Sequence, residues 1–124
     1  MPPKERLEKQ LKDVKRNLEA LHKILLDATR RDYEKVHGPV KNPNAYLELA
    51  LKDPLFGWLR PMSQLLVDIN DLLEEPVGEV DIFDIRVRAR AVLSSGKYLE
   101  LLQSDPQVGM SHGPVRWALQ QLGT

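Results

Sequence analysis

The first candidates for chemistry are two pairs with the spacing Glu-x-x-His, formed by Glu19 with His22 and by Glu34 with His37. At this spacing two side chains lie on one helix face and can bind one metal ion, as in di-iron helical bundles. Such a site takes one pair from each of two helices, whereas both pairs here fall on a single predicted helix, about 22 Å apart at the helical rise. Chance spacing on a charged helix is therefore the favoured interpretation, and we predict neither a metal site nor a cofactor.

A second candidate site combines two aromatic residues, Phe56 and Trp58, with Arg60 and the following Pro61. A helix kinked at Pro61 could leave a pocket in which Arg60 binds an anion or a carboxylate. The simpler interpretation is that Phe56 packs in the core and Trp58 is half buried, since aromatic residues at helical spacing usually pack. Tyr33 completes the set of candidate residues for a ligand pocket.

No recognisable catalytic set is present in the sequence. Ser63 lacks the flanking glycines of a nucleophile elbow, and no glycine-rich phosphate loop occurs. The histidines His37 and His112 each precede a Gly-Pro pair and are expected to lie in turns or caps. Because the chain has no cysteine, disulfides and thiolate metal sites are excluded. We therefore favour a protein that is not an enzyme.

The element that would position most of these residues is a long first helix, predicted from Pro3 to Val36. Its apolar residues recur at spacings of four and three, which is the pattern of a heptad seam. They are Leu7, Leu11, Val14, Leu18, Leu21, Leu25 and Ala28. A helix of this length runs about 50 Å, whereas a compact chain of this size is about 35 Å across. We therefore expect the N-terminal half of the helix to protrude.

The apolar stripe of this helix is narrow up to Leu18 and widens from Leu21, which suggests a two-helix seam followed by a domain core. The narrow part consists of the interface candidates Leu7, Leu11, Val14 and Leu18. An exposed leucine seam needs a partner, which would be either a second copy or another element of this chain. We predict a homodimer, or binding of a partner helix, through this seam.

Shorter helices are predicted after the first one. They span Ala45–Lys52, the region from Pro54 to Leu73, Tyr98–Gln103 and Pro114–Leu122, with a loop from Gln107 to Gly113. Within the second of these regions, Pro61 should kink the helix or mark a later start.

The segment from Ile82 to Leu93 is ambiguous. Ile85, Val87 and Ala89 alternate with arginines, as in a strand, but the same segment also carries a helical apolar stripe. No other segment alternates well enough to pair with a strand, so a helix is preferred.

These elements predict an all-α fold in one domain, residues 1–124. The long N-terminal helix would pack on an antiparallel helix centred on Leu59–Leu73, and shorter C-terminal helices would close the core. The short apolar runs argue against a membrane span, and the absence of a leader suggests a cytoplasmic location. Eighteen acidic residues balance eighteen basic ones among the 124 residues, which makes nucleic-acid binding unlikely despite Arg86, Arg88 and Arg90.

Several short motifs resemble those of a group of small all-helical bacterial proteins of no known activity. The matching residues are Leu21-His22, Arg31, Tyr33-Glu34, His37-Gly38-Pro39-Val40, Asp53-Pro54, Phe56, Trp58-Leu59-Arg60-Pro61, Ser63, Ile69, Tyr98, Leu102-Gln103 and Asp105-Pro106. The group tends to carry an aspartate where this sequence has Asn70. The resemblance implies a bacterial cytosolic helical protein and nothing about its chemistry.

The sequence thus predicts a non-enzymatic interaction or regulatory protein. The alternative is a helical bundle that binds a small ligand or a metal, using Trp58, Arg60, Tyr33 and the histidines.

Overall fold

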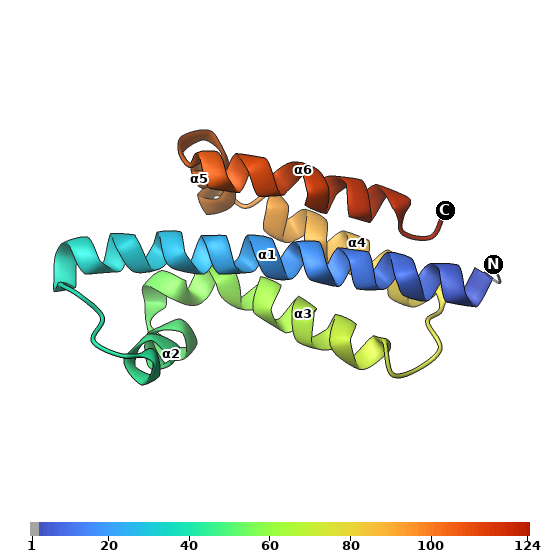
Figure 1. Ribbon diagram of the computed structural model, residues 1–124, viewed down its shortest axis with the longest axis horizontal. Helices are drawn as coiled ribbons and strands as arrows, with labels where there is room; N and C mark the ends of the chain where they lie inside the picture. The colour runs from blue at the N-terminus through green and yellow to red at the C-terminus, as the bar shows by residue number, and fades with distance from the viewer. Residues whose placement is uncertain (1–2) are drawn as a thin grey trace.

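The computed structural model describes residues 3–124, and within this range the regular structure is entirely helical (Figure 1). The elements are α1 (Pro3–His37), α2 (Pro43–Lys52), the 3₁₀ helix η1 (Pro54–Leu59), α3 (Arg60–Leu72), α4 (Glu79–Leu93), α5 (Gly96–Ser104) and α6 (Pro106–Gln121). The all-α prediction is therefore confirmed. Helix α4 also settles the ambiguous segment in favour of a helix. No helix in the described range is long and apolar enough to cross a membrane.

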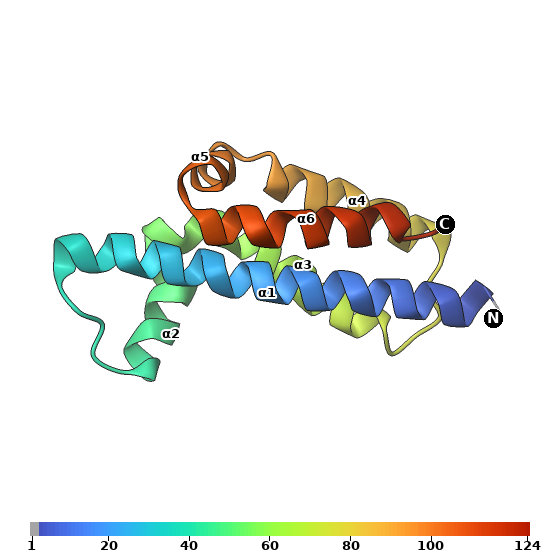
Figure 2. The ribbon, with the colours of Figure 1, turned by 45° about the horizontal axis from the view of Figure 1, so that its top comes forward.

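Helix α1 runs the length of the molecule between α3 and α6 (Figures 1 and 2). Both of these helices run antiparallel to α1, and α6 makes the more extensive contact with it. Helix α4 packs on α3, and the short α5 lies between the end of α4 and the start of α6. The antiparallel helix expected around Leu59–Leu73 is thus α3, but α6 is the larger partner of α1.

Side-chain caps set most of the helix starts. The carboxylate of Asp53 accepts a hydrogen bond from the Leu55 backbone N–H (2.9 Å) at the start of η1. Asp105 does the same for the Gln107 N–H (2.9 Å) at the start of α6. In each case a proline follows the cap, where its missing N–H costs nothing. Pro61 stands in the first turn of α3, so it marks a later helix start, which is one of its two predicted roles.

The expected loop from Gln107 to Gly113 is wrong, because α6 is continuous from Pro106 to Gln121 with Pro114 inside it. One face of α6 is buried from end to end by Val108, Val115, Ala118 and Leu122, while Gly113 and Pro114 lie on the exposed side. A residue before proline normally avoids the helical conformation, partly because its Cβ clashes with the proline ring. Gly113 has no Cβ, which removes that part of the clash. His112 therefore lies within a helix and not in a turn.

The leucine seam of α1 is covered by other helices of the same chain. Leu11, Val14 and Leu18 are at most 1% exposed, and Leu7 is half buried against the core. The prediction of a protruding, open seam is wrong, because α3 and α6 lie along α1 in an elongated molecule (Figure 1). Of the two partners expected for the seam, a second copy or another element of this chain, the structure shows the latter.

The two ends of the described chain lie side by side. The side chain of Gln10 accepts a hydrogen bond from the Gly123 backbone N–H (3.0 Å) and donates one to the Thr124 hydroxyl (3.3 Å). These contacts hold the residues after α6 against the first turns of α1.

Candidate functional site

The four residues predicted to line a ligand pocket do not converge on one cavity. Phe56 is fully buried, and its ring centroid lies 6.5 Å from that of Tyr33. Trp58 is half buried against the core, whereas Arg60 is exposed and donates to the Asp53 carbonyl (2.9 Å). Tyr33 lines a cavity between the end of α1 and α2, and none of the other three residues lines that cavity. Phe56 therefore packs in the core and Trp58 is half buried, as expected for aromatic residues that pack and do not line a pocket.

The weak metal candidates on α1 also stay apart. They are Glu19, His22, Glu34 and His37. Glu19 is exposed, Glu34 accepts a hydrogen bond from the Val40 N–H (2.8 Å), and His37 stacks on Tyr33 with centroids 4.4 Å apart. Within residues 3–124, no three histidine, aspartate or glutamate side chains come together in an arrangement that could hold a metal ion.

His22 is instead hydrogen-bonded to Ser63, with 2.7 Å between Nε2 and the hydroxyl oxygen. The Ser63 hydroxyl also lies 3.3 Å from the Leu59 carbonyl, to which it can donate. Burial lowers the pKa of His22. No carboxylate in the described chain is hydrogen-bonded to the imidazole, so the pair lacks the third member of a catalytic triad. Its role here is to join α1 to α3.

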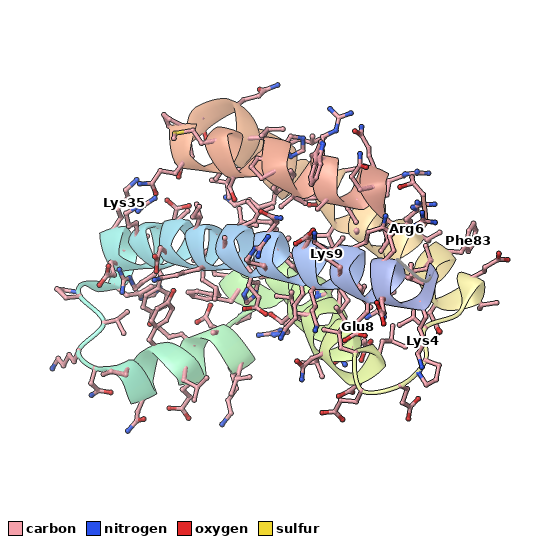
Figure 3. The ribbon with its side chains drawn as sticks, turned by 45° about the vertical axis from the view of Figure 1, so that its right-hand side comes forward. Lys4, Arg6, Glu8, Lys9, Lys35 and Phe83 are labelled. Carbon is pink, nitrogen blue, oxygen red and sulfur yellow. The ribbon has the colours of Figure 1, made fainter. Side chains whose placement is uncertain are left out.

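An exposed apolar surface lies on the outer face of α4, formed by Val80, Phe83 and Val87. These side chains are 82%, 71% and 47% exposed. They recur at spacings of three and four, so they form one stripe along the helix. Figure 3 shows Phe83 projecting away from the helices at one end of the molecule. The opposite side of α4, with Ile82 and Ile85, fills the core.

These three residues were not among the sequence candidates, although the sequence carried a signal for them. The alternation of apolar residues that suggested a strand comes from a helix with apolar residues on two faces. A helix that is apolar on one face only would have shown a clean helical period. The ambiguous pattern therefore marked a helix with a second apolar surface.

Charged residues border the outer face of α4. Glu79 and Arg90 are about three helical turns apart, which places them along the same edge of the stripe. Neither side chain forms an ion pair with another residue of the described chain. On the other edge, Arg88 binds Asp68 (2.7 Å) and Asp84 (3.5 Å). One edge of the stripe thus keeps a free acid at one end and a free base at the other.

Comparisons with protein-family models, with curated proteins and with solved structures found no match for this chain.

Proposed function

We propose that this is a non-enzymatic interaction protein that pairs with a second copy of itself through the outer face of α4. The observation that carries the proposal is the exposure of Phe83, between Val80 and Val87, on a helix whose opposite face is buried. Single exposed apolar side chains are common on protein surfaces, but a contiguous apolar stripe is typical of an interaction site.

Burial of apolar side chains at this face would favour association. Burying one phenylalanine side chain contributes about 1.5–3 kcal/mol. A two-fold interface uses the same surface on both copies, so each residue of the outer face is buried once on each copy. Two copies of Phe83, with the flanking valines, therefore supply several times that energy, against the entropy cost of association.

The charges at the edge of the face favour a second copy as the partner. In an antiparallel pair of α4 helices centred between Phe83 and Val87, each Phe83 stands opposite Val87 of the other copy. The same arrangement brings Glu79 beside Arg90 of the other copy, so that two equivalent ion pairs form across the interface. Both side chains are exposed and have no ion pair within the described chain, so the pairing would cost no existing salt bridge.

This proposal keeps the predicted homodimer but moves its interface from the first helix to α4, because Leu11, Val14 and Leu18 are buried within the chain. The alternative of a ligand-binding bundle built on Trp58, Arg60 and Tyr33 has less support, since these residues do not share a cavity. The bacterial origin implied by the resemblance and the cytoplasmic location stay predictions.

Sedimentation equilibrium at micromolar concentration tests the dimer. The wild-type protein should sediment at twice the chain mass of 14.2 kDa. Phe83→Ser should weaken the dimer about 100-fold or more, since apolar burial is lost on both copies. Val67→Ser is the matched control, because Val67 is also exposed (53%) but lies on α3. A wild-type monomer at every concentration, or a Phe83→Ser dimer as tight as wild type, would overturn the proposal.

A charge exchange tests the choice of partner. Glu79→Lys and Arg90→Glu should each weaken the dimer by roughly threefold or more, because each places like charges beside one another at two positions. The double variant should restore the dimer. If the double variant is weaker than both single variants, the antiparallel pairing of α4 is wrong.

A further inference from the structure

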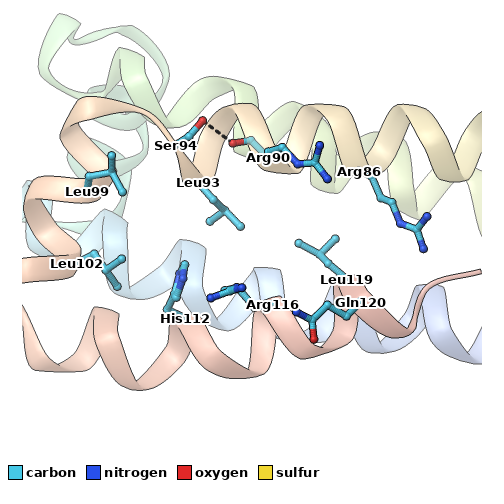
Figure 4. Close-up of a pocket in the computed structure, with 10 residues that line it drawn as sticks. All are labelled: Arg86, Arg90, Leu93, Ser94, Leu99, Leu102, His112, Arg116, Leu119 and Gln120. Carbon is cyan, nitrogen blue, oxygen red and sulfur yellow. Dashed lines mark hydrogen bonds between the residues drawn. The ribbon is translucent and has the colours of Figure 1, made fainter.

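A cavity of about 540 Å³ opens between α4 and α6, with α5 at one end (Figure 4). These two helices contact each other little, because each packs mainly on another helix of the bundle. The residues that line the cavity are Arg86, Arg90, Leu93, Ser94, Leu99, Leu102, His112, Arg116, Leu119 and Gln120. None of them was a candidate for a ligand pocket in the sequence.

The two walls of the cavity repeat one pattern. Helix α4 contributes two arginines and a leucine, which are Arg86, Arg90 and Leu93. Helix α6 contributes a histidine, an arginine and a leucine at the same spacing, which are His112, Arg116 and Leu119. Spacings of four and three place each set on one helix face. Because the helices run in opposite directions, the leucine of each wall lies near the first member of the other set. Figure 4 shows Leu93 and Leu119 between the two walls.

Positive charge in this cavity is not compensated within one copy of the described chain. The lining includes three arginines and no carboxylate. Within the described chain, neither Arg90 nor Arg116 forms an ion pair, and Arg86 donates to the neutral carbonyl of Leu122. Three guanidinium groups around one cavity create a field that attracts an anion.

The floor of the cavity is apolar. Leu93, Leu102 and Leu119 are partly buried and pack against the core. His112 accepts a hydrogen bond at Nδ1 from the Tyr98 hydroxyl, at 2.5 Å, when the imidazole is neutral. Burial and the nearby Arg116 lower the pKa of His112 and so favour that neutral form. The fixed positive charge therefore comes from the arginines, above a surface of leucines.

We propose that the cavity between α4 and α6 binds a single-chain anionic amphiphile, with its carboxylate or phosphate held by the arginines and its apolar chain on the leucines. Guanidinium groups bind both head groups through paired hydrogen bonds. A volume of about 540 Å³ lies in the range of small-molecule sites. It would hold only about one turn of a helix 10 Å wide, which favours a small ligand over a partner helix.

Isothermal titration calorimetry with sodium decanoate and with decyl phosphate, below their micelle concentrations, tests this site. Both should bind the wild-type protein. Acetate and inorganic phosphate lack the chain and decanol lacks the charge, so each should bind about tenfold or more weakly. Arg116→Gln should weaken decanoate binding about tenfold or more, because a charge-assisted hydrogen bond is lost. Arg16→Gln is the matched control, since Arg16 is exposed on α1 and should leave binding unchanged.

Three outcomes would overturn the proposal. These are no binding of either amphiphile, decanol binding as tightly as decanoate, and equal decanoate binding by Arg116→Gln and wild type. Sedimentation with phosphatidylglycerol vesicles distinguishes a membrane lipid from a free amphiphile: binding to vesicles alone would also overturn it. Phe83→Ser should bind decanoate at least as tightly as wild type, because Phe83 does not line this cavity and loss of the dimer removes Glu79 of the other copy from beside Arg90. Failure of the dimer and failure of the ligand site are thereby separable.

Discussion

Nε2 of His22 lies 2.7 Å from the hydroxyl oxygen of Ser63, which connects α1 to α3 beside the core. The imidazole is partly buried, and this burial lowers the pKa of His22 from 6.5. At neutral pH the ring is therefore uncharged, and its hydrogen bond to Ser63 is one between neutral partners.

This arrangement predicts that the protein loses stability as the pH falls. Below pH 6.5 the unfolded chain binds a proton at His22 more readily than the folded protein does, so the free energy of unfolding rises with pH in this range. The stability is fully present above about pH 7 and declines as the pH drops through the unfolded value of about 6.5. His112 contributes in the same direction. Urea unfolding measured between about pH 7.5 and 5.5 would show the slope.

The slope should decrease in His22→Gln, which removes the titrating group. His37→Gln is the control, because His37 is exposed at the end of α1. If His22→Gln retains the full pH dependence, protonation of His22 is not its cause.

Truncation of Leu11 should destabilise the monomer and leave self-association intact. Leu11 is fully buried, so Leu11→Ala should reduce the free energy of unfolding by about 2–5 kcal/mol. Leu47→Ala, at a position 60% exposed on α2, should cost far less. Chemical denaturation of these variants measures the free energy of unfolding, and sedimentation measures their self-association. A stable Leu11→Ala protein that has lost its dimer would return the interface to the first helix.

Gly109→Ala should stabilise the protein. Gly109 lies within α6, and a Cβ added there would meet no atom within 4 Å. Alanine in an exposed helical position is favoured over glycine by about 0.5–1 kcal/mol. Gly38→Ala should have the opposite effect, because Gly38 has a φ of +82°, where a side chain is strained. Thermal melting of the two variants would compare them. A lower melting temperature for Gly109→Ala would contradict the continuous α6.

Tyr98→Phe should cost about 0.5–1.5 kcal/mol of unfolding free energy, because it removes the hydrogen bond between Tyr98 and His112. Tyr98 is fully buried, and burial raises the pKa of its hydroxyl to about 12. Tyr46→Phe is the control, since the Tyr46 hydroxyl makes a longer bond, 3.3 Å, to Asp27. Urea denaturation would measure both. Equal stability of Tyr98→Phe and wild type would show that the Tyr98–His112 bond contributes nothing.

The helices whose ends are marked by local chemistry were predictable from the sequence. Asp53 stands directly before Pro54 and caps η1 in the structure. Asp105 stands before Pro106 in the same way and caps α6, although a loop was predicted there from Gln107 onward. The first helix was equally clear, because its apolar residues keep a helical period over many turns. The all-α class follows from these local signals without knowledge of the tertiary contacts.

The two His-Gly-Pro-Val segments show why the rest could not be predicted. At His37–Val40 the segment ends α1, and Gly38 adopts a positive φ. At His112–Val115 the same four residues continue α6 through a proline, because Val115 is 1% exposed in the core and anchors the helix there. The same residue types thus adopt two conformations, and the tertiary burial of one valine decides between them.

The candidate sites were hidden for a different reason. The cavity between α4 and α6 brings Arg90 and Arg116 together from helices far apart in the sequence, and no local pattern indicates which helices will be neighbours. The leucine seam was recognised correctly as a surface in need of a partner. Its partner could not be named, since the Gly113-Pro114 pair indicated a loop within the segment that forms α6.

The pairing of α1 with α6 also has a consequence for synthesis of the chain. The leucines of α1 leave the ribosome early, whereas α6 follows all the other described helices. Until residues 106–121 have emerged, the nascent chain presents an uncovered apolar seam, which is the kind of surface that chaperones bind. The core can therefore close only after translation of α6.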